Sequence, residues 1–314
     1  MNRQLDMGGG SMKSVARLGF AARWIVLGLT VGAMMGLVGG CASKSSPPAP
    51  AKAKAWVEAD RLSRQAARLQ SEGDWNGALA WWDRAALQFQ LLNDRTNLAM
   101  AWHNQGMARR ALGRTDEAIA DLERAARVNA ELGLTESWWR NQIGLLQVAN
   151  DVQSPRLGEL LGELDRRTGR PESGQLGAIL SHERARAWMA MGRLEEARVE
   201  AERAVTGFDA IADRAGKAAA RVTLAKTLRR LGQFGEAEAV WRGVLAEFEA
   251  MGDPRGVAVS LAGLGGCLAE GGGDTRVAAD LLKRAEENYL ALGWKGEAGK
   301  LAAERERLQV RARE

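Results

Sequence analysis

Apolar and small residues recur at helical spacing through most of the chain. The pattern is clearest from residue 99 to residue 133, where two apolar-periodic stretches flank a short polar turn at 113–116. Apolar positions three and four residues apart predict amphipathic helices. Gly106, Ala118 and Ala125 stand where two such helices would approach closely. This stretch is therefore expected to form an antiparallel pair of helices.

The glycine of this turn marks a repeat along the chain. Equivalent glycines stand at Gly73, Gly113, Gly192, Gly232 and Gly273, with gaps of 40, 79, 40 and 41 residues. The gap of 79 residues spans two units, and Asp151-Val152 occupies the place of the missing turn. A small residue follows each glycine five positions later, at Ala78, Ala118, Ala197, Ala237 and Ala278. A second mark, such as Leu132-Gly133, closes each unit, and two marks in one register predict a true repeat.

About six such units fit between residues 55 and 293. The third, at about 135–170, is degenerate. Its Ser154-Pro155 resembles a helix start with proline in the first helical position, and the helix that follows is short. From Trp294 onward, a polar helix carrying Leu301 and Leu308 can cover the last unit, as the end of a solenoid requires.

The stretch 99–133 resembles a tetratricopeptide repeat (TPR), a helix–turn–helix unit with small and large apolar residues at set positions. The residues that carry the resemblance are Trp102, Gly106, Ala118, Leu122 and Ala125. One such unit cannot bury its apolar face alone, so it requires neighbours. The resemblance implies an all-α fold, namely a right-handed superhelical solenoid of antiparallel helix pairs over residues 55–314 with a C-terminal capping helix.

The first 40 residues have the layout of a secretory signal peptide. Basic residues precede the uncharged stretch 24–38, and Val38-Gly39-Gly40-Cys41 ends it. This ending resembles the lipobox of bacterial lipoproteins, which implies cleavage after residue 40 and lipidation of Cys41. Ala42 in place of aspartate implies sorting to the outer membrane, facing the periplasm, if the source is Gram-negative. An uncleaved transmembrane anchor is the alternative, because the run 24–43 has the minimum length for a span.

Residues 41–54 are expected to be a flexible tether, since they combine Ser, Pro, Ala and Lys without apolar periodicity. Met12-Lys13 would be a natural start, which leaves open whether residues 1–11 are translated.

Charge and candidate chemistry change the picture little. Of the formal charge of +5, residues 1–40 carry +3, and acidic and basic residues are interspersed along the rest. We therefore expect no nucleic-acid partner. Cys267 lies among small apolar residues and is expected to be a buried thiol. The common nucleophile, metal and cofactor motifs are missing, so we expect no enzymatic activity, no metal and no cofactor.

TPR arrays usually bind partners on the concave surface lined by the first helix of each unit. The resemblance places there Met100, His103, Met107, Arg110, Ile179, His182, Arg186, Met189, Val222, Lys226 and Arg229. Both histidines occupy the same position in their units, which chance also explains. Methionine and valine beside arginine and lysine suit a peptide with apolar residues and an acidic group. Trp81, Trp138 and Trp139 are further candidates for partner contacts. Adjacent helix residues point about 100° apart, so one tryptophan of each adjacent pair is expected to be exposed.

The sequence thus predicts a membrane-anchored scaffold of the bacterial cell envelope that binds a protein or peptide partner, with assembly of an envelope or pilus complex as one setting. Two alternatives stay open. One is a periplasmic binding protein for a small ligand or a cell-wall glycan. The other is an enzyme without a recognisable motif.

Overall fold

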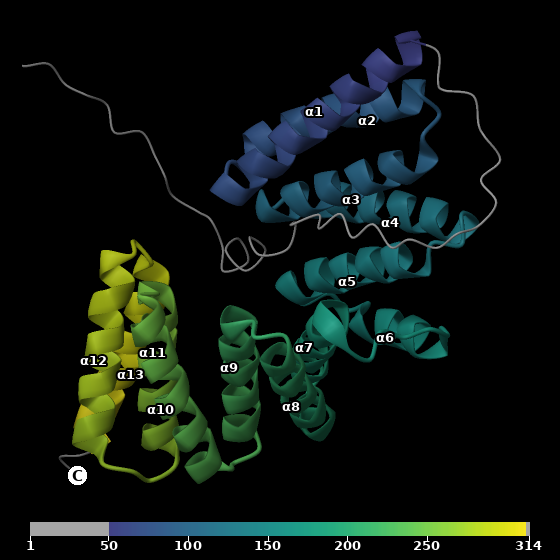
Figure 1. The fold of residues 1–314 in the computed structure, drawn as a ribbon. Coiled ribbons are helices and arrows are strands. Elements are labelled where there is room, and N and C mark those ends of the chain that lie inside the picture. The colour runs from purple at the N-terminus through teal and green to yellow at the C-terminus, as the bar shows by residue number, and fades with distance from the viewer. Residues whose placement is uncertain (1–49, 312–314) are drawn as a thin grey trace, which may run out of the picture.

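The computed structural model describes residues 50–311, which form thirteen α-helices and no strand (Figure 1). The helices are α1 (Pro50–Glu72), α2 (Trp75–Leu91), α3 (Arg95–Ala111), α4 (Thr115–Glu131), α5 (Thr135–Asp151), α6 (Leu157–Arg166), α7 (Gly174–Ala190), α8 (Leu194–Ala210), α9 (Arg214–Arg230), α10 (Phe234–Met251), α11 (Pro254–Glu270), α12 (Thr275–Ala291) and α13 (Lys295–Arg311). None of these helices is long and apolar enough to cross a membrane.

Successive helices pack as antiparallel pairs, and the pairs follow one another in a curved row from α1 to α13 (Figure 1). Each helix contacts mainly the helices before and after it in the chain. The first helices of successive pairs also contact one another, from α3 through α5, α7 and α9 to α11. We call these five helices the inner layer. The prediction of an all-α solenoid of helix pairs is confirmed.

The turn inside each pair depends on one residue in the left-handed region. Glycine takes this conformation in five pairs, with φ between +74° and +81°, because it lacks the Cβ that would clash. The third pair has Gln153 there instead, with φ of +50°, directly after the Asp151-Val152 segment predicted to replace the turn. In the sixth pair the left-handed residue is Gly272 and not Gly273, so the prediction was wrong by one residue. The extra residue lengthens the turn before α12.

Aspartate side chains define where many of the helices begin. Asp74, Asp94, Asp213, Asp253 and Asp274 precede α2, α3, α9, α11 and α12, and each accepts a hydrogen bond from a backbone N–H of the first turn. The first N–H groups of a helix have no partner within the helix, so such caps stabilise its start. Pro254 then occupies the first helical position of α11, where proline is well tolerated.

Close helix contacts explain the small residues of the repeat. A Cβ on Gly106 of α3 would lie 2.8 Å from Leu122 Cγ on α4. Ala118 and Ala125 of α4 are fully buried. Since added volume at such contacts strains a packed core, these positions accept only small side chains. At the other end of the row, Leu301 and Leu308 of α13 are buried against the last pair, as expected of a capping helix.

Two boundaries differ in detail from the prediction. Helix α1 begins at Pro50, so residues 50–54, predicted as the end of the tether, belong to the helix. Proline suits a first helical position, and the alanine and lysine residues that follow favour a helix. The shortened helix of the third unit is present as α6, but it begins at Leu157, two residues after Pro155. The predicted signal peptide, Cys41 and residues 41–49 of the tether lie outside the described residues.

Candidate functional site

The predicted groove residues all lie on three helices of the inner layer, α3, α7 and α9. Met100 and Lys226 are exposed. Eight others are partly buried, namely His103, Arg110, Ile179, His182, Arg186, Met189, Val222 and Arg229. Most of the predicted groove residues therefore reach the surface of the inner layer, but only a small part of each side chain is exposed.

Two predicted contact residues are buried. Met107 is 6% exposed and packs with Leu122, Leu145 and Val148, so its placement in the groove was wrong. Helix α5 of the degenerate third unit covers it. Trp139 is 1% exposed, so the prediction that it is available to a partner was also wrong.

The other two tryptophan candidates are partly buried and carry cations on their rings. The Arg84 guanidinium lies 5.0 Å from the Trp81 ring centre, and Arg61 lies 5.6 Å from the same ring. Arg167 lies 4.5 Å from the ring centre of Trp138. Such cation–π contacts are typical of ring faces that have already found a partner.

The arginines of α3 and α7 meet on one acidic residue of α5. Arg110 Nε lies 2.7 Å from Asp151 Oδ2, and Arg186 Nη2 lies 3.0 Å from Asp151 Oδ1. The side chain of Arg110 is only 6% exposed. Arg110 also donates to Gln147 on α5 over 3.1 Å. These contacts tie three consecutive inner helices together through charged groups.

Glu183 is the most deeply placed carboxylate of this network. It is 4% exposed, and Arg186 Nη1 lies 2.7 Å from its Oε2. Asn150 Nδ2 donates to the same oxygen and to the Glu183 backbone carbonyl, both over 2.9 Å. Burial by itself would raise the pKa of Glu183, but Arg186, and then His182 and Arg110, lower it to about 2. The carboxylate is therefore charged at all ordinary pH values.

Each of the two histidines forms a hydrogen bond to the next inner helix, through different ring nitrogens. Asn141 Nδ2 on α5 donates to His103 Nδ1 over 3.1 Å, and His182 Nε2 hydrogen-bonds Thr223 Oγ1 on α9 over 3.1 Å. Burial lowers the pKa of each histidine to about 4, helped by Arg140 near His103. Both rings are therefore neutral at pH 7 and serve as polar contacts between repeats, which explains why they share one position.

Helix α9 carries two cations that have no carboxylate partner in this network. Arg229 binds Glu270 on α11 through two hydrogen bonds of 2.8 and 2.6 Å. Lys226 and Arg230 are exposed, and neither has a carboxylate partner among residues 50–311. Arg230 donates only to the backbone carbonyl of Met189. Although much of the Lys226 side chain is exposed, the surrounding protein removes water from its ammonium group, and this loss of hydration, together with the nearby Arg186, lowers the pKa of Lys226.

Sequence reasoning missed the acidic half of this surface. Asp151, Glu183 and Glu270 were not predicted as groove residues, yet they neutralise three predicted arginines. A signal was present in the spacing. The contacts Arg110–Asp151 and Arg229–Glu270 both join residues 41 apart, which is one repeat plus one position. Within the described part of the chain, no group of three or more His, Cys, Asp or Glu residues could hold a metal ion.

Comparisons with known proteins agree with this architecture. Residues 99–132 match the tetratricopeptide repeat family. The chain contains a tetratricopeptide repeat within a TPR-like solenoid. None of the curated protein sequences matches it.

Among solved structures, the Rap protein complexed with Competence and Sporulation Factor has a TM-score of 0.59 and 12% sequence identity, and the match covers 81% of this chain and 76% of that one. BtubC (BKLC) from P. vanneervenii has a TM-score of 0.40 at 18% identity, covering 77% of this chain and 90% of that one. The TPR2AB domain of yeast Sti1 in complex with pHSP90 has a TM-score of 0.36 at 14% identity, covering 81% and 99%. The likeness to Rap shows a shared fold.

Proposed function

We propose that this TPR-like solenoid is an interaction scaffold that holds a peptide segment of a protein partner against its inner layer. The observation that carries the proposal is that two cations of α9 have no carboxylate partner within the described residues. Lys226 and Arg230 are four residues apart and thus lie on one face of the helix. The three arginines predicted to line the groove, Arg110, Arg186 and Arg229, already have carboxylate partners.

An acidic group of the partner would complete this pattern. The Lys226 ammonium is close enough to Arg186 for that charge to lower its pKa, and a bound carboxylate would relieve the repulsion. A hydrogen bond to a charged group contributes about 1.5–3 kcal/mol. Met189 of α7, whose backbone carbonyl accepts a hydrogen bond from Arg230, is partly buried and offers an apolar contact to the same segment. The Rap protein, which shares the fold, was crystallised with Competence and Sporulation Factor, and so this architecture accommodates a bound factor.

Site-specific crosslinking tests the groove. A photo-crosslinking residue is introduced at Met100, and capture of partners from the source cells is compared for the parent, Lys226→Glu and Arg230→Glu. Arg276→Glu is the matched control, because Arg276 is exposed on α12, outside the inner layer. We expect either α9 substitution to reduce capture about tenfold, as the loss of one charged hydrogen bond implies, and the control to leave it unchanged. Equal capture by all variants would refute an acidic contact on α9.

We further propose that the scaffold is anchored to a membrane of the bacterial envelope through Cys41. Support comes from the signal-like residues 1–40 and from Val38-Gly39-Gly40-Cys41. Metabolic labelling with palmitate should be lost in Cys41→Ser and kept in Cys267→Ser, and Cys41→Ser should leave the membrane fraction. Labelling that survives Cys41→Ser would exclude this anchor without affecting the groove.

A further inference from the structure

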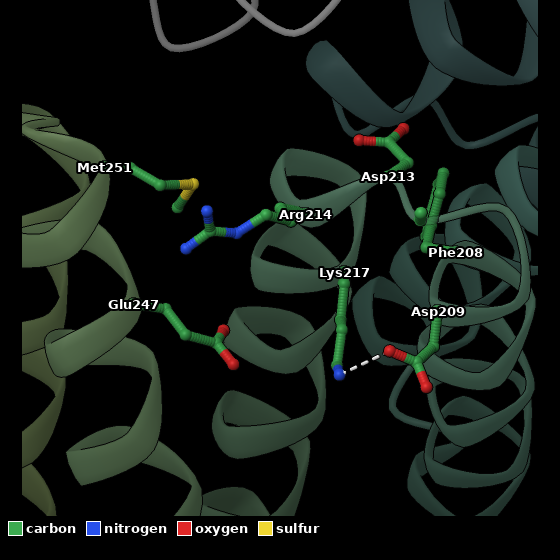
Figure 2. A pocket seen from close by; sticks show the side chains of 8 residues that line it. Phe208, Asp209, Asp213, Arg214, Lys217, Glu247 and Met251 are labelled. Atoms are coloured by element: carbon green, nitrogen blue, oxygen red, sulfur yellow. Dashed lines mark hydrogen bonds and ion pairs between the residues drawn. The ribbon is translucent and has the colours of Figure 1, made fainter.

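A small cavity lies outside the inner-layer groove, where the C-terminal ends of α8 and α10 meet the start of α9 (Figure 2). Its volume is about 160 Å³. Phe208 and Met251 give it apolar walls, and Arg214, Lys217 and Glu247 bring charged groups to it. A cavity of about 150 Å³ holds a ligand of six carbon atoms. The space thus suits a small molecule and not a long peptide.

The charges around the cavity are only partly neutralised. Lys217 Nζ lies 2.6 Å from Asp209 Oδ1, which accounts for that lysine. Glu247 uses Oε1 to bind Arg221, whereas its Oε2 is buried and has no hydrogen-bond partner. Among residues 50–311, the guanidinium of Arg214 forms no ion pair or hydrogen bond, and Figure 2 draws none between it and the other cavity residues. One cation without an ion pair and the side chain of one carboxylate therefore line the same small space.

The unpaired Arg214 departs from the pattern of the regular repeat. Arg95 begins α3 as Arg214 begins α9, and Arg95 pairs with Glu131, the last residue of α4. The corresponding position of α10 is Ala250. The carboxylate that would neutralise Arg214 is therefore replaced by a methyl group.

The apolar side of the cavity is held rigidly. Asp213 caps α9 by accepting a hydrogen bond of 2.8 Å from Gly216 N. The Phe208 ring lies so close to this turn that a Cβ on Gly216 would be 2.4 Å from Phe208 Cδ1. Because the ring is 4% exposed and packed on both sides, it presents a fixed edge to the cavity.

We propose that this cavity binds the zwitterion of a small apolar α-amino acid. The ligand carboxylate pairs with the guanidinium of Arg214, which is suited to bidentate carboxylate contacts. The ligand ammonium lies against the carboxylate of Glu247, whose side chain lines the cavity and is 31% exposed. The aliphatic side chain lies between Phe208 and Met251. A site with both a cation and an anion selects a ligand that carries both charges, and it disfavours molecules that carry only one.

Calorimetric titration of the full chain with L-leucine tests the proposal. Leucinamide imitates a peptide N-terminus and N-acetyl-leucine imitates a peptide C-terminus, so these two probes distinguish a free amino acid from the end of a protein. We expect L-leucine to bind and each analogue to bind at least about tenfold more weakly, because each lacks one charged contact. An analogue that binds as well as L-leucine, or the absence of any heat at millimolar L-leucine, would overturn the proposal.

Variants assign the binding to this cavity. Arg214→Gln and Glu247→Gln should each weaken L-leucine about tenfold or more. Arg276→Gln, at the equivalent start of an outer helix, should not change it. Glu247→Gln also loses the contact with Arg221, so Arg214→Gln, on an exposed residue, provides the test if the other variant folds poorly. Unchanged L-leucine binding in Arg214→Gln would show that the amino acid binds elsewhere.

Discussion

Replacing Glu183 by glutamine removes one negative charge from the centre of the inner layer while keeping the size of the side chain. In the parent, this carboxylate is 4% exposed, pairs with Arg186 and accepts a hydrogen bond from Asn150. The variant leaves the partly buried guanidinium of Arg186 with Asp151 as its remaining carboxylate partner. Loss of one partner from a buried ion pair is costly because the other charge stays desolvated.

The shift in the pKa of Glu183 sets the expected magnitude. A fall from 4.5 to about 2 corresponds to about 3 kcal/mol, at about 1.4 kcal/mol per pKa unit. Measured losses of one partner in buried ion pairs are about 3–5 kcal/mol, which agrees with this value. We therefore expect Glu183→Gln to lower the free energy of unfolding at pH 7 by about 3 kcal/mol. For a domain of this size, that lowers the melting temperature by about 10 °C.

The pH dependence has a definite sign. Because the pKa of Glu183 is lower in the folded chain than in the unfolded chain, its contribution is complete above pH 4.5 and is lost as the pH falls toward 2. The difference between parent and Glu183→Gln should therefore be largest near neutral pH and shrink below pH 4.5. Urea unfolding followed by tryptophan fluorescence and circular dichroism, repeated across this range, measures the difference.

Glu249→Gln is the matched control, since Glu249 is exposed on α10 and has no ion pair among the described residues. It should change the free energy of unfolding by less than about 0.5 kcal/mol. If Glu183→Gln were equally harmless, or if its cost were the same at pH 3 as at pH 7, the inner-layer ion network would not stabilise the solenoid as described.

Three further predictions concern packing, histidine titration and thiol reactivity. Gly263→Ala would place a Cβ 2.3 Å from a buried indole ring, so it should lower the free energy of unfolding by about 1–3 kcal/mol. Gly299→Ala, with open space around the new Cβ, should raise it by about 0.5–1 kcal/mol, and thermal unfolding measures both. The pKa values of His103 and His182 fall from 6.5 in the unfolded chain to about 4 in the folded chain. Their contribution to the free energy of unfolding is therefore complete above pH 6.5 and is lost as the pH falls toward 4. A double glutamine variant should flatten the dependence of urea unfolding on pH in that window. Cys267 is 1% exposed and burial raises its pKa, so a disulfide reagent should label it only on unfolding.

Much of the fold could be predicted because its signals are local. Turn glycines, capping aspartates and small residues at close helix contacts act within a few residues of their own position, and they recur in register. The same logic located the degenerate third unit, where Gln153 takes the left-handed turn. The prediction failed where a local rule allowed two answers, as at Gly272 and Gly273 or at the start of α1. Either of two neighbouring glycines can adopt the left-handed conformation that the turn requires. A tether rich in alanine also favours a helix.

The groove was predicted less well, because exposure depends on what packs over a side chain. Met107 has the sequence position of a groove residue, yet α5 covers it. Trp138 and Trp139 are equivalent in sequence, but only Trp139 is fully buried. No local pattern distinguishes these cases, since the covering residues belong to other helices.

By itself, the sequence determined the number and order of the helix pairs, because helical periodicity and turn chemistry are properties of short segments. Only the tertiary structure decided which charges are neutralised. Arg110 meets Asp151, and Arg229 meets Glu270, across 41 residues of chain, while Lys226 and Arg214 meet no carboxylate partner within the described residues. The physical reason is that ion pairing depends on distances between side chains of different helices, and those distances exist only once the repeats have stacked.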